Sequence, residues 1–362
     1  MLTSSELQGD LRELSLRLQE SLKLDHLYAI TDHNAVLQHA TFSIPAKREG
    51  YTTDDNGRAL VFAAKAQRYW ASDRLTELQR KLLAFILLMQ SDDGRFHNFM
   101  DFSQRIVGEP AVGDHLGRAI WSTGAVIHSE LQTGMKNSAR LIFDRALPWG
   151  MSSAYLRTKA YTCLGLVERL RADAGDENLA LNLEHLAGDL FNQFKKNATD
   201  SWDWFENSLT YDNARLSQAL FAAYDTLGKE EFRGAAEKSL SFLLRATTQD
   251  GKHVPIGNNG WYTKGGRAAM YDQQPIDAGA MAETTALAYK LTGRDIYANG
   301  FRQALGWFFG LNTKGAAVYD PTTGACYDGI TPAGLNQNQG SESTLSFLLG
   351  AVTAIENLGQ ST

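Results

Sequence analysis

The stretch YTTDDNGRAL at residues 51–60 decides the fold, because its polar, acid-rich turn opens directly into an apolar helix over 61–70. Its outline recurs as GDHLGRAI at 113–120 and as TYDNARL at 210–216. Each copy places an aspartate a few residues before an arginine at the start of a helix. Three such starts in one chain predict a ring of equivalent helix ends, and a ring of helix ends predicts a mouth.

Helical periodicity continues outward from these starts in pairs of helices with a period of roughly 40 to 65 residues, which favours an array of helical hairpins. An N-terminal helix can supply the partner that the last helix lacks, which closes the array into a ring. We therefore predict an all-α (α/α)6 toroid of six helical hairpins, with short strands in the loops at the mouth. The expected helices cover residues 4–24, 57–70, 73–89, 115–131, 137–147, 153–171, 178–195, 212–227, 230–246, 277–291, 295–310 and 341–357.

The composition favours a single globular domain and argues against a nucleic-acid-binding or membrane-spanning protein. The chain has 362 residues, 43% hydrophobic and 10% aromatic, with a net charge of −6. No Pro-, Ser- or Gly-rich linker divides it, so we expect a single catalytic-type domain over 1–362. Acids and bases are interspersed, with no basic stripe for nucleic acid. No apolar run approaches the ~18 residues of a membrane span, and residues 1–6 lack a signal-peptide pattern. We expect a cytoplasmic protein that binds neither nucleic acid nor membrane.

Three stretches carry a family resemblance: TDDNGRAL at 53–60, DGRFHNF at 93–99 and QGSEST at 339–344. They resemble a bacterial group within the six-hairpin glycosidase superfamily, over residues 51–358. Members of that group accompany or are fused to glycosyltransferases and occur near mannan-active enzymes. The resemblance implies the (α/α)6 fold, a glycan substrate and a possible association with a glycosyltransferase. It brings no mechanism that can be carried over residue by residue.

The aspartates at the starts of the first helices should line the funnel of such a toroid, since all inner helices begin at one end. They are Asp54, Asp55, Asp114, Asp212 and Asp277. Aspartate is also among the best N-caps, worth about 1 kcal/mol, so each could serve only as a cap. Because one cap is enough for a helix, Asp55 beside Asp54 is the stronger functional candidate.

Arginines at equivalent helix starts need an explanation, because the helix dipole disfavours a cation there. They are Arg58, Arg118, Arg157 and Arg215. One explanation is an ion pair within the turn, from Asp54 to Arg58, Asp114 to Arg118 and Asp212 to Arg215. The other is a site for a substrate hydroxyl pair, carboxylate or phosphate, which a planar guanidinium can hold with two hydrogen bonds.

The loops that precede the helices add acids, aromatic rings and amides. Aromatic rings are the usual platforms for sugars, and amides suit hydroxyl recognition, although Trp202 and Trp204 could equally be core residues and Glu206 a solvated acid. An Asp-Gly turn such as 93–94 is common after a helix, and a lone histidine is more often structural. The loop candidates are Asp93, Arg95, His97, Trp202, Trp204, Glu206, Tyr211, Trp261, Asp272, Gln274, Asn338 and Glu342.

Many carboxylates among aromatics and amides match the needs of glycoside hydrolysis, which uses one protonated acid and one ionised carboxylate. We therefore predict a glycoside hydrolase, inverting as most of the resembling superfamily is, that acts on a manno- or gluco-oligosaccharide. The candidate acid and base are Asp55, Asp114, Glu206 and Asp272. The candidate substrate-binding residues are Asp54, Arg58, Asp93, Arg95, His97, His115, Arg118, Trp202, Trp204, Tyr211, Asp212, Trp261, Gln274, Asp277, Asn338 and Glu342.

Neither a metal nor an organic cofactor is expected, because no His-x-x-x-His or Cys-x-x-Cys pair and no Gly-rich phosphate loop occurs. Two distant cysteines, Cys163 and Cys326, fit a reducing compartment. Three other functions stay open. They are a glycoside phosphorylase or sugar-phosphate enzyme that uses the arginines, a non-catalytic glycan-binding partner of a glycosyltransferase, and an epimerase with His97 and His115 at the mouth.

Overall fold

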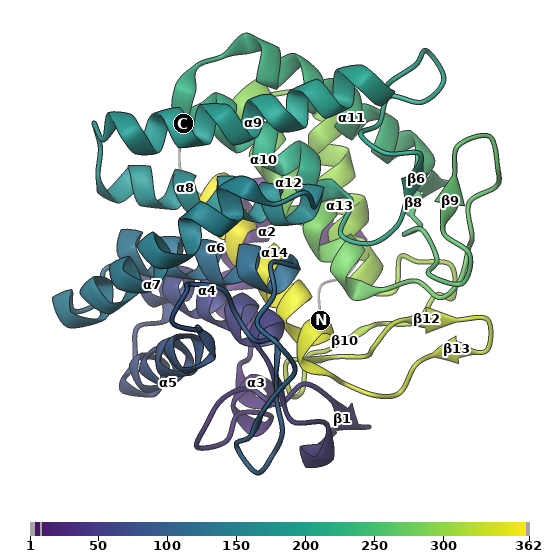
Figure 1. The fold of residues 1–362 in the computed structure, drawn as a ribbon. Coiled ribbons are helices and arrows are strands. Elements are labelled where there is room, and N and C mark those ends of the chain that lie inside the picture. Colours follow the sequence, from purple (N-terminus) through teal and green to yellow (C-terminus); the bar gives the residue numbers. More distant parts are fainter. Residues whose placement is uncertain (1–3, 8, 360–362) are drawn as a thin grey trace.

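The computed structural model describes residues 4–7 and 9–359, and its helices form two concentric rings (Figure 1). Each inner helix contacts the next along the chain, and the last contacts the first, so the inner ring is closed. The inner helices are α4 (Thr53–Trp70), α6 (Asp114–His128), α8 (Leu156–Ala172), α10 (Ala214–Leu227), α12 (Pro275–Thr292) and α14 (Ser341–Leu358). This arrangement confirms the predicted (α/α)6 toroid.

An outer helix packs on each inner one. Five of the outer helices directly follow their inner partners, whereas the sixth comes from the start of the chain and packs on α14. The N-terminal segment therefore closes the toroid, as predicted. The outer helices are α5 (Asp73–Met89), α7 (Thr133–Ser152), α9 (Glu177–Asn197), α11 (Glu230–Ala246), α13 (Asp295–Phe308) and α2 (Leu11–Ser21).

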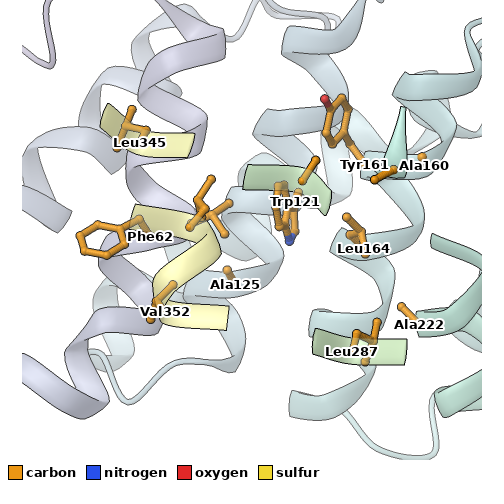
Figure 2. Packing of buried hydrophobic residues seen from close by; sticks show 14 of the residues in the cluster. Phe62, Trp121, Ala125, Ala160, Tyr161, Leu164, Ala222, Leu287, Leu345 and Val352 are labelled. Atoms are coloured by element: carbon orange, nitrogen blue, oxygen red, sulfur yellow. The ribbon is translucent and has the colours of Figure 1, made fainter. Parts of the chain in front are cut away.

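The core lies between the two rings and inside the inner one. Inner helices are buried nearly all round; Thr53 to Ala66 of α4, for example, exposes only Asp54 and Lys65 in part. Each outer helix buries only the stripe of residues that packs on the inner ring, because its other side faces solvent. Figure 2 shows side chains from neighbouring inner helices packed together, among them Phe62, Leu345, Val352, Trp121, Ala125, Tyr161, Leu164, Ala222 and Leu287.

Two pairs of inner helices approach so closely that their backbones touch at glycines. A Cβ on Gly124 of α6 would lie 2.4 Å from the carbonyl oxygen of Gly165 on α8. A Cβ on Gly279 of α12 would lie 2.4 Å from the carbonyl oxygen of Ser346 on α14. Real side chains cannot come that near, so glycine at these positions sets the spacing of the ring.

Two expectations about helix boundaries are wrong. The single helix expected over 4–24 is three: α1 (Ser4–Leu7), α2 and α3 (Asp25–Ala29). The turn at Gly9 separates the first two, and the Asp10 side chain caps α2 by accepting from the backbone of Arg12 and Glu13. Helix α4 begins at Thr53 instead of 57, because Thr52 caps it. The expectation for residues 1–6 falls partly on residues 1–3, outside the described residues.

Short strands occur in the loops that lead into the inner helices, so they gather at the mouth as predicted. All of the pairings are antiparallel. The strands pair as β1 (Ala40–Thr41) with β2 (Ile44–Pro45), β3 (Tyr51–Thr52) with β4 (Phe99–Met100), β4 with β5 (Ile106–Val107), β6 (Ser208–Leu209) with β9 (Tyr262–Thr263), β7 (Thr248–Gln249) with β8 (Lys252–His253), β10 (Tyr319–Asp320) with β11 (Ala325–Cys326), and β12 (Ile330–Thr331) with β13 (Gly334–Leu335).

Within the described residues, no helix combines the length and the apolar character that crossing a membrane requires.

The close contact between α6 and α8 predicts the effect of adding one methyl group. Gly124→Ala should lower the free energy of unfolding by about 1–3 kcal/mol, because the ring must widen to relieve the contact. Gly188→Ala is the matched control: Gly188 lies inside outer helix α9, and a Cβ there would meet nothing within 4 Å. That change should add up to about 1 kcal/mol through helix propensity. Urea unfolding of both variants checks the pair, and equal effects would contradict the close-packed ring.

Candidate functional site

Four arginines lie in the first two turns of consecutive inner helices, and all are buried. The positive end of the helix dipole and the loss of water make such a position costly for a cation without an anion beside it. Each has a carboxylate oxygen close by, at 2.8 Å for Arg58, 2.5 Å for Arg118, 3.0 Å for Arg157 and 2.6 Å for Arg215. The register predicted for these residues is therefore realised as a set of buried ion pairs.

A cavity of about 520 Å³ opens at this end of the toroid, and we call it the central pocket. Carboxylates and guanidiniums reach it from α14, α4 and α6, which are consecutive in the inner ring. Aromatic and amide side chains reach it from the segments leading into α8, α10 and α12, the other half of the ring. Its polar and aromatic lining is Asp54, Arg58, Asp114, Arg118, Tyr155, Tyr211, Asn258, Trp261, Gln274 and Glu342.

Asp54 lies on the wall of the central pocket and is held in place from the neighbouring helix. Its Oδ1 accepts a hydrogen bond of 2.5 Å from Arg118. Burial alone would raise the pKa of Asp54, but Arg118 and then Arg58 outweigh burial and hold the pKa below its usual value. Asp54 is thus a partly exposed carboxylate that stays ionised. The ion pair predicted between Asp54 and Arg58 is instead made with Arg118.

Asp55 is buried behind Arg58 and does not line the central pocket. It lies 2.8 Å from Arg58, and its other oxygen accepts from the hydroxyl of Thr52 at 2.6 Å. The backbone N–H of Asp55 in turn donates to the Thr52 hydroxyl, which caps α4. Asp55, predicted as a catalytic acid or base, thus lies behind the pocket wall and contacts Arg58, which also binds Glu342 at 2.8 Å.

Asp114 also lines the central pocket, and its partners are hydroxyl groups. Tyr211 donates to one carboxylate oxygen at 2.8 Å, and Thr158 donates to the other at 3.4 Å. The ion pair expected with Arg118 is replaced by pairs from Arg118 to Asp54 and Asp212. Among the described residues, Asp114 is the one carboxylate of this pocket that has no guanidinium within ion-pair distance.

Glu206 supports the site from outside the central pocket. It binds Arg157 at 3.0 Å, and Arg157 also donates to the backbone oxygen of Tyr211 at 2.7 Å. The Arg157 guanidinium lies 4.8 Å from the centre of the Tyr211 ring. Glu206 therefore acts through Arg157 on the loop that presents Tyr211. Glu206 was predicted as an acid or base, but its carboxylate pairs with Arg157 and does not line the central pocket.

The two tryptophans predicted as a sugar platform are core residues. Trp202 is 2% exposed and Trp204 is 0% exposed. Trp202 packs against Phe242 and Tyr262, with ring centres 5.0 and 5.1 Å apart. The alternating spacing places both rings under the loop, so the platform prediction is wrong for both. Tyr211 and Trp261 occupy the pocket in their place, with ring centres 6.4 Å apart.

The structure does not bring the Asp93 loop or the predicted histidine pair into the pocket. Asp93 and Arg95 bind each other at 2.7 Å. A ring nitrogen of His97 lies 2.9 Å from the carbonyl oxygen of Gly108, and one of His115 lies 3.1 Å from that of Phe96. These contacts tie loops to the mouth. A substrate-binding role for them is therefore corrected to a structural one.

Asp212 and Asp277 lie beneath the pocket rather than on its wall. Asp212 joins Arg118 and Arg215 and accepts from the hydroxyl of Tyr161. Asp277 Oδ2 has no hydrogen-bond partner within the described residues. Burial raises the pKa of Asp277 well above its usual range, and the nearby Asp212 adds to the shift. Neither carboxylate lines the central pocket, where a substrate-binding role was expected for both.

A second cavity of about 360 Å³, the outer pocket, adjoins the central one. The two share Asn258, Gln274 and Glu342 as lining residues, so Glu342 stands at their junction. Asp272 lines only the outer pocket. Asn338 does not line it, and its side chain instead accepts a hydrogen bond of 3.0 Å from the backbone of Phe42.

Several lining residues carried no prediction. Tyr155 directly precedes α8, two residues before Arg157, so its position at the start of a predicted inner helix is the signal that could have found it. Asp328 and His39 line the outer pocket from irregular loops, where no periodicity marks them. Asp328 Oδ1 accepts from the backbone N–H of Gly340 and the hydroxyl of Ser343, both at 2.7 Å. These bonds fasten its loop to the start of α14.

No family model matches the sequence, and no curated protein matches it. Several solved structures, in contrast, are similar to the fold of this chain. A sugar epimerase from a ruminal bacterium is 12% identical, with a TM-score of 0.73, over 94% of this chain and 98% of that one. The cellobiose 2-epimerase of Spirochaeta thermophila is 12% identical, with a TM-score of 0.73, over 96% of this chain and 97% of that one.

An α-1,6-mannanase from a Salegentibacter species is also 12% identical, with a TM-score of 0.64, over 96% of this chain and 99% of that one. An inactive variant of that mannanase, with two adjacent aspartates replaced by asparagine, has been solved with α-1,6-mannotriose. Identities this low show the fold alone. The chain therefore has the (α/α)6 toroid fold that these structures share.

Proposed function

We propose that this protein is a glycoside hydrolase that acts on a manno- or gluco-oligosaccharide in the central pocket. One observation carries the proposal: the pocket has a carboxylate half and an aromatic half. Asp54, Asp114 and Glu342 come from consecutive inner helices, while Tyr211 and Trp261 come from the other half of the ring. A sugar ring needs both, because its C–H face stacks on aromatic rings while its hydroxyls bind charged and amide groups.

Asp54 and Asp114 differ in the groups that bind them, since Asp54 pairs with Arg118 and Asp114 is bound by hydroxyls. The arginines hold Asp54 ionised, as the lowered pKa requires, so it can activate water or stabilise positive charge on the sugar. Asp114 has the hydroxyls of Tyr211 and Thr158 as its partners, and no guanidinium of the described residues lies within ion-pair distance of it. We assign Asp114 as the general acid and Asp54 as the ionised partner. Glu342, paired with Arg58 at the junction, is assigned to hydroxyl binding.

The comparisons support this choice in one respect. The mannanase with this fold becomes inactive when two adjacent aspartates are changed, and this chain has adjacent aspartates at Asp54 and Asp55. Here one faces the pocket and the other holds Arg58. Inversion stays a proposal: carboxyl groups about 6.5–9.5 Å apart in the substrate complex would support it, and about 5 Å would favour retention.

Phosphorolysis is the weaker alternative, because the arginines of the central pocket already have anions. Arg58 binds Asp55 and Glu342, and Arg118 binds Asp54 and Asp212. Phosphate would have to displace a carboxylate from one of them. A non-catalytic partner of a glycosyltransferase would need the pocket to bind glycan but would not need the difference between Asp54 and Asp114.

Epimerisation is suggested by the names of two structures with this fold. It requires groups that remove and return a proton at carbon, a task performed most often by histidine. No histidine lines the central pocket within the described residues, since His97 and His115 bind backbone oxygens elsewhere. Hydrolysis by carboxylates therefore fits this pocket better.

The direct test is a panel of manno- and gluco-oligosaccharides assayed for new reducing ends, with and without phosphate, and for epimerised product. We expect phosphate-independent release of reducing sugar. Asp114→Asn should lower kcat by about 10²–10⁴-fold, the usual contribution of a general acid, while the thermal midpoint stays unchanged because only hydroxyl contacts are altered.

Asp55→Asn is the matched control for that variant. It should cost stability, about 3 kcal/mol, because it takes a buried carboxylate from Arg58. Full activity in Asp114→Asn would remove Asp114 as the acid. Sugar phosphate as the product, or an epimer without hydrolysis, would replace the proposal with the corresponding alternative.

The lowered pKa of Asp54 predicts how stability depends on pH. The ionised carboxylate contributes stability fully above the unfolded pKa of about 3.9, and this is lost as pH falls through the lower folded pKa. The stability difference between the wild-type protein and Asp54→Asn should therefore be constant from pH 7 to about pH 5 and shrink below about pH 4. Urea unfolding across this range measures it. A difference that grows on acidification would contradict the assigned ionised state.

A further inference from the structure

The turn between β1 and β2 places a phenylalanine at a backbone position that usually holds glycine, asparagine or aspartate. Two residues, Phe42 and Ser43, connect the paired strands. Such a turn favours glycine, asparagine or aspartate at positions with positive φ. Phe42 has a φ of 52° there, and its side chain is 63% exposed. A bulky ring gains little from burial in this position and adds backbone strain of about 1–2 kcal/mol.

The backbone of Phe42 is fastened to the rim of the outer pocket. Its N–H donates to Asn338 Oδ1 at 3.0 Å, and its carbonyl oxygen accepts from the N–H of Gln339 at 2.9 Å. The carbonyl oxygen of Asn338 accepts from the N–H of Asp328, a lining residue of that pocket, at 2.8 Å. These bonds fix the turn that carries the exposed ring to the loop that leads into the outer pocket.

A second aromatic residue has the same rare backbone conformation. Trp261 has a φ of 56° and lines the central pocket. Among the non-glycine residues with positive φ in the described chain, Phe42 and Trp261 are the aromatic ones. Trp261 lines the central pocket, and the backbone of Phe42 is bound to Asn338 and Gln339, which directly precede Gly340 of the outer pocket. Strain that persists at two such places points to a function that the ring performs outside the fold.

The groups of the outer pocket suit sugar hydroxyls. Asp272 and Asp328 supply carboxylates, Gln38 and Asn336 are amides, and the cavity of about 360 Å³ falls in the range of ligand sites. The side chain of Asp272 makes no hydrogen bond or ion pair within the described residues. The outer pocket lies next to the central one, and the two share Asn258, Gln274 and Glu342 as lining residues.

We propose that the substrate is an oligosaccharide of at least three units that spans both pockets, with the reacting linkage beside Glu342 and the distal units in the outer pocket against Phe42. This inference rests on the proposed function. It adds the length of the substrate and names Phe42 as the residue that makes activity depend on that length. Phe42 would stack on the distal sugar, a contact of the kind that aromatic rings make with the C–H face of a ring.

The test uses Phe42→Asn, because asparagine accepts positive φ and so removes the ring without harming the turn. Substrates are α-1,6-linked manno-oligosaccharides and β-1,4-linked gluco-oligosaccharides of two to five units. With the productive series, kcat/KM of the wild type should rise from two to four units. In Phe42→Asn that rise should be lost, leaving kcat/KM about tenfold lower on four units and unchanged on two. The thermal midpoint should stay equal or increase.

Two controls separate the ring from the turn. Phe42→Tyr keeps a ring and should keep the dependence on length. Gln104→Asn makes the same turn-favouring change at another positive-φ residue, outside both pockets, and should leave activity on every length unchanged. Equal activity of Phe42→Asn and wild type on all lengths would overturn the inference, as would a loss that is the same for two and four units.

Failure of the proposed function gives a different result. If no oligosaccharide of either series is cleaved, calorimetric binding of the same oligosaccharides tests the inference by itself. Affinity that increases with length in the wild type and not in Phe42→Asn would support it without hydrolysis. Affinity independent of length, or no binding of either series, would overturn it.

Discussion

Burial of guanidinium groups at the starts of the inner helices is the constraint on which the rest of the mouth depends. A cation in that position is opposed by the helix dipole and by the loss of water, so each must be matched by a carboxylate. Arg118 takes Asp54 from α4 and Asp212 from the segment before α10, and Arg215 takes Glu283 from α12. These pairs join helices that are distant in sequence, and they set where each pocket carboxylate lies.

The same constraint divides the carboxylates between support and chemistry. Asp55 forms an ion pair with Arg58, and Glu206 forms one with Arg157, so both carboxylates hold arginines in place. Asp54 shares Arg118 and yet stays partly exposed on the pocket wall, where its charge is maintained. Asp114 forms no ion pair within the described residues and accepts hydrogen bonds from two hydroxyl groups. The wall of the central pocket thus carries one carboxylate that is paired with an arginine and one that is bound by hydroxyls.

Backbone strain in the loops near the pockets accompanies the ion pairs of the inner helices. Trp261 and Phe42 both hold aromatic rings on positive-φ backbone beside the two connected pockets. At Phe42 the local preference of the turn is opposed by hydrogen bonds with the neighbouring loop, in which the Phe42 N–H donates to Asn338 Oδ1 and the Phe42 carbonyl oxygen accepts from the N–H of Gln339. Charged groups of the inner helices and aromatic rings of the loops therefore meet at one cleft, which suits a ligand with polar edges and apolar faces.

The toroid was predictable from the sequence because the apolar period and the repeated acid–arginine starts are local signals, and closure followed from counting helices. The site was predictable in outline: Asp54, Arg58, Asp114 and Arg118 do line the pocket. Which of two adjacent aspartates faces it was not, because a helix turns by about 100° per residue and the partner of Asp54 comes from another helix. Asp328 lay in an irregular loop without any pattern. The sequence by itself determined the ring and the residues at its mouth, and the tertiary structure alone decided how their charges pair.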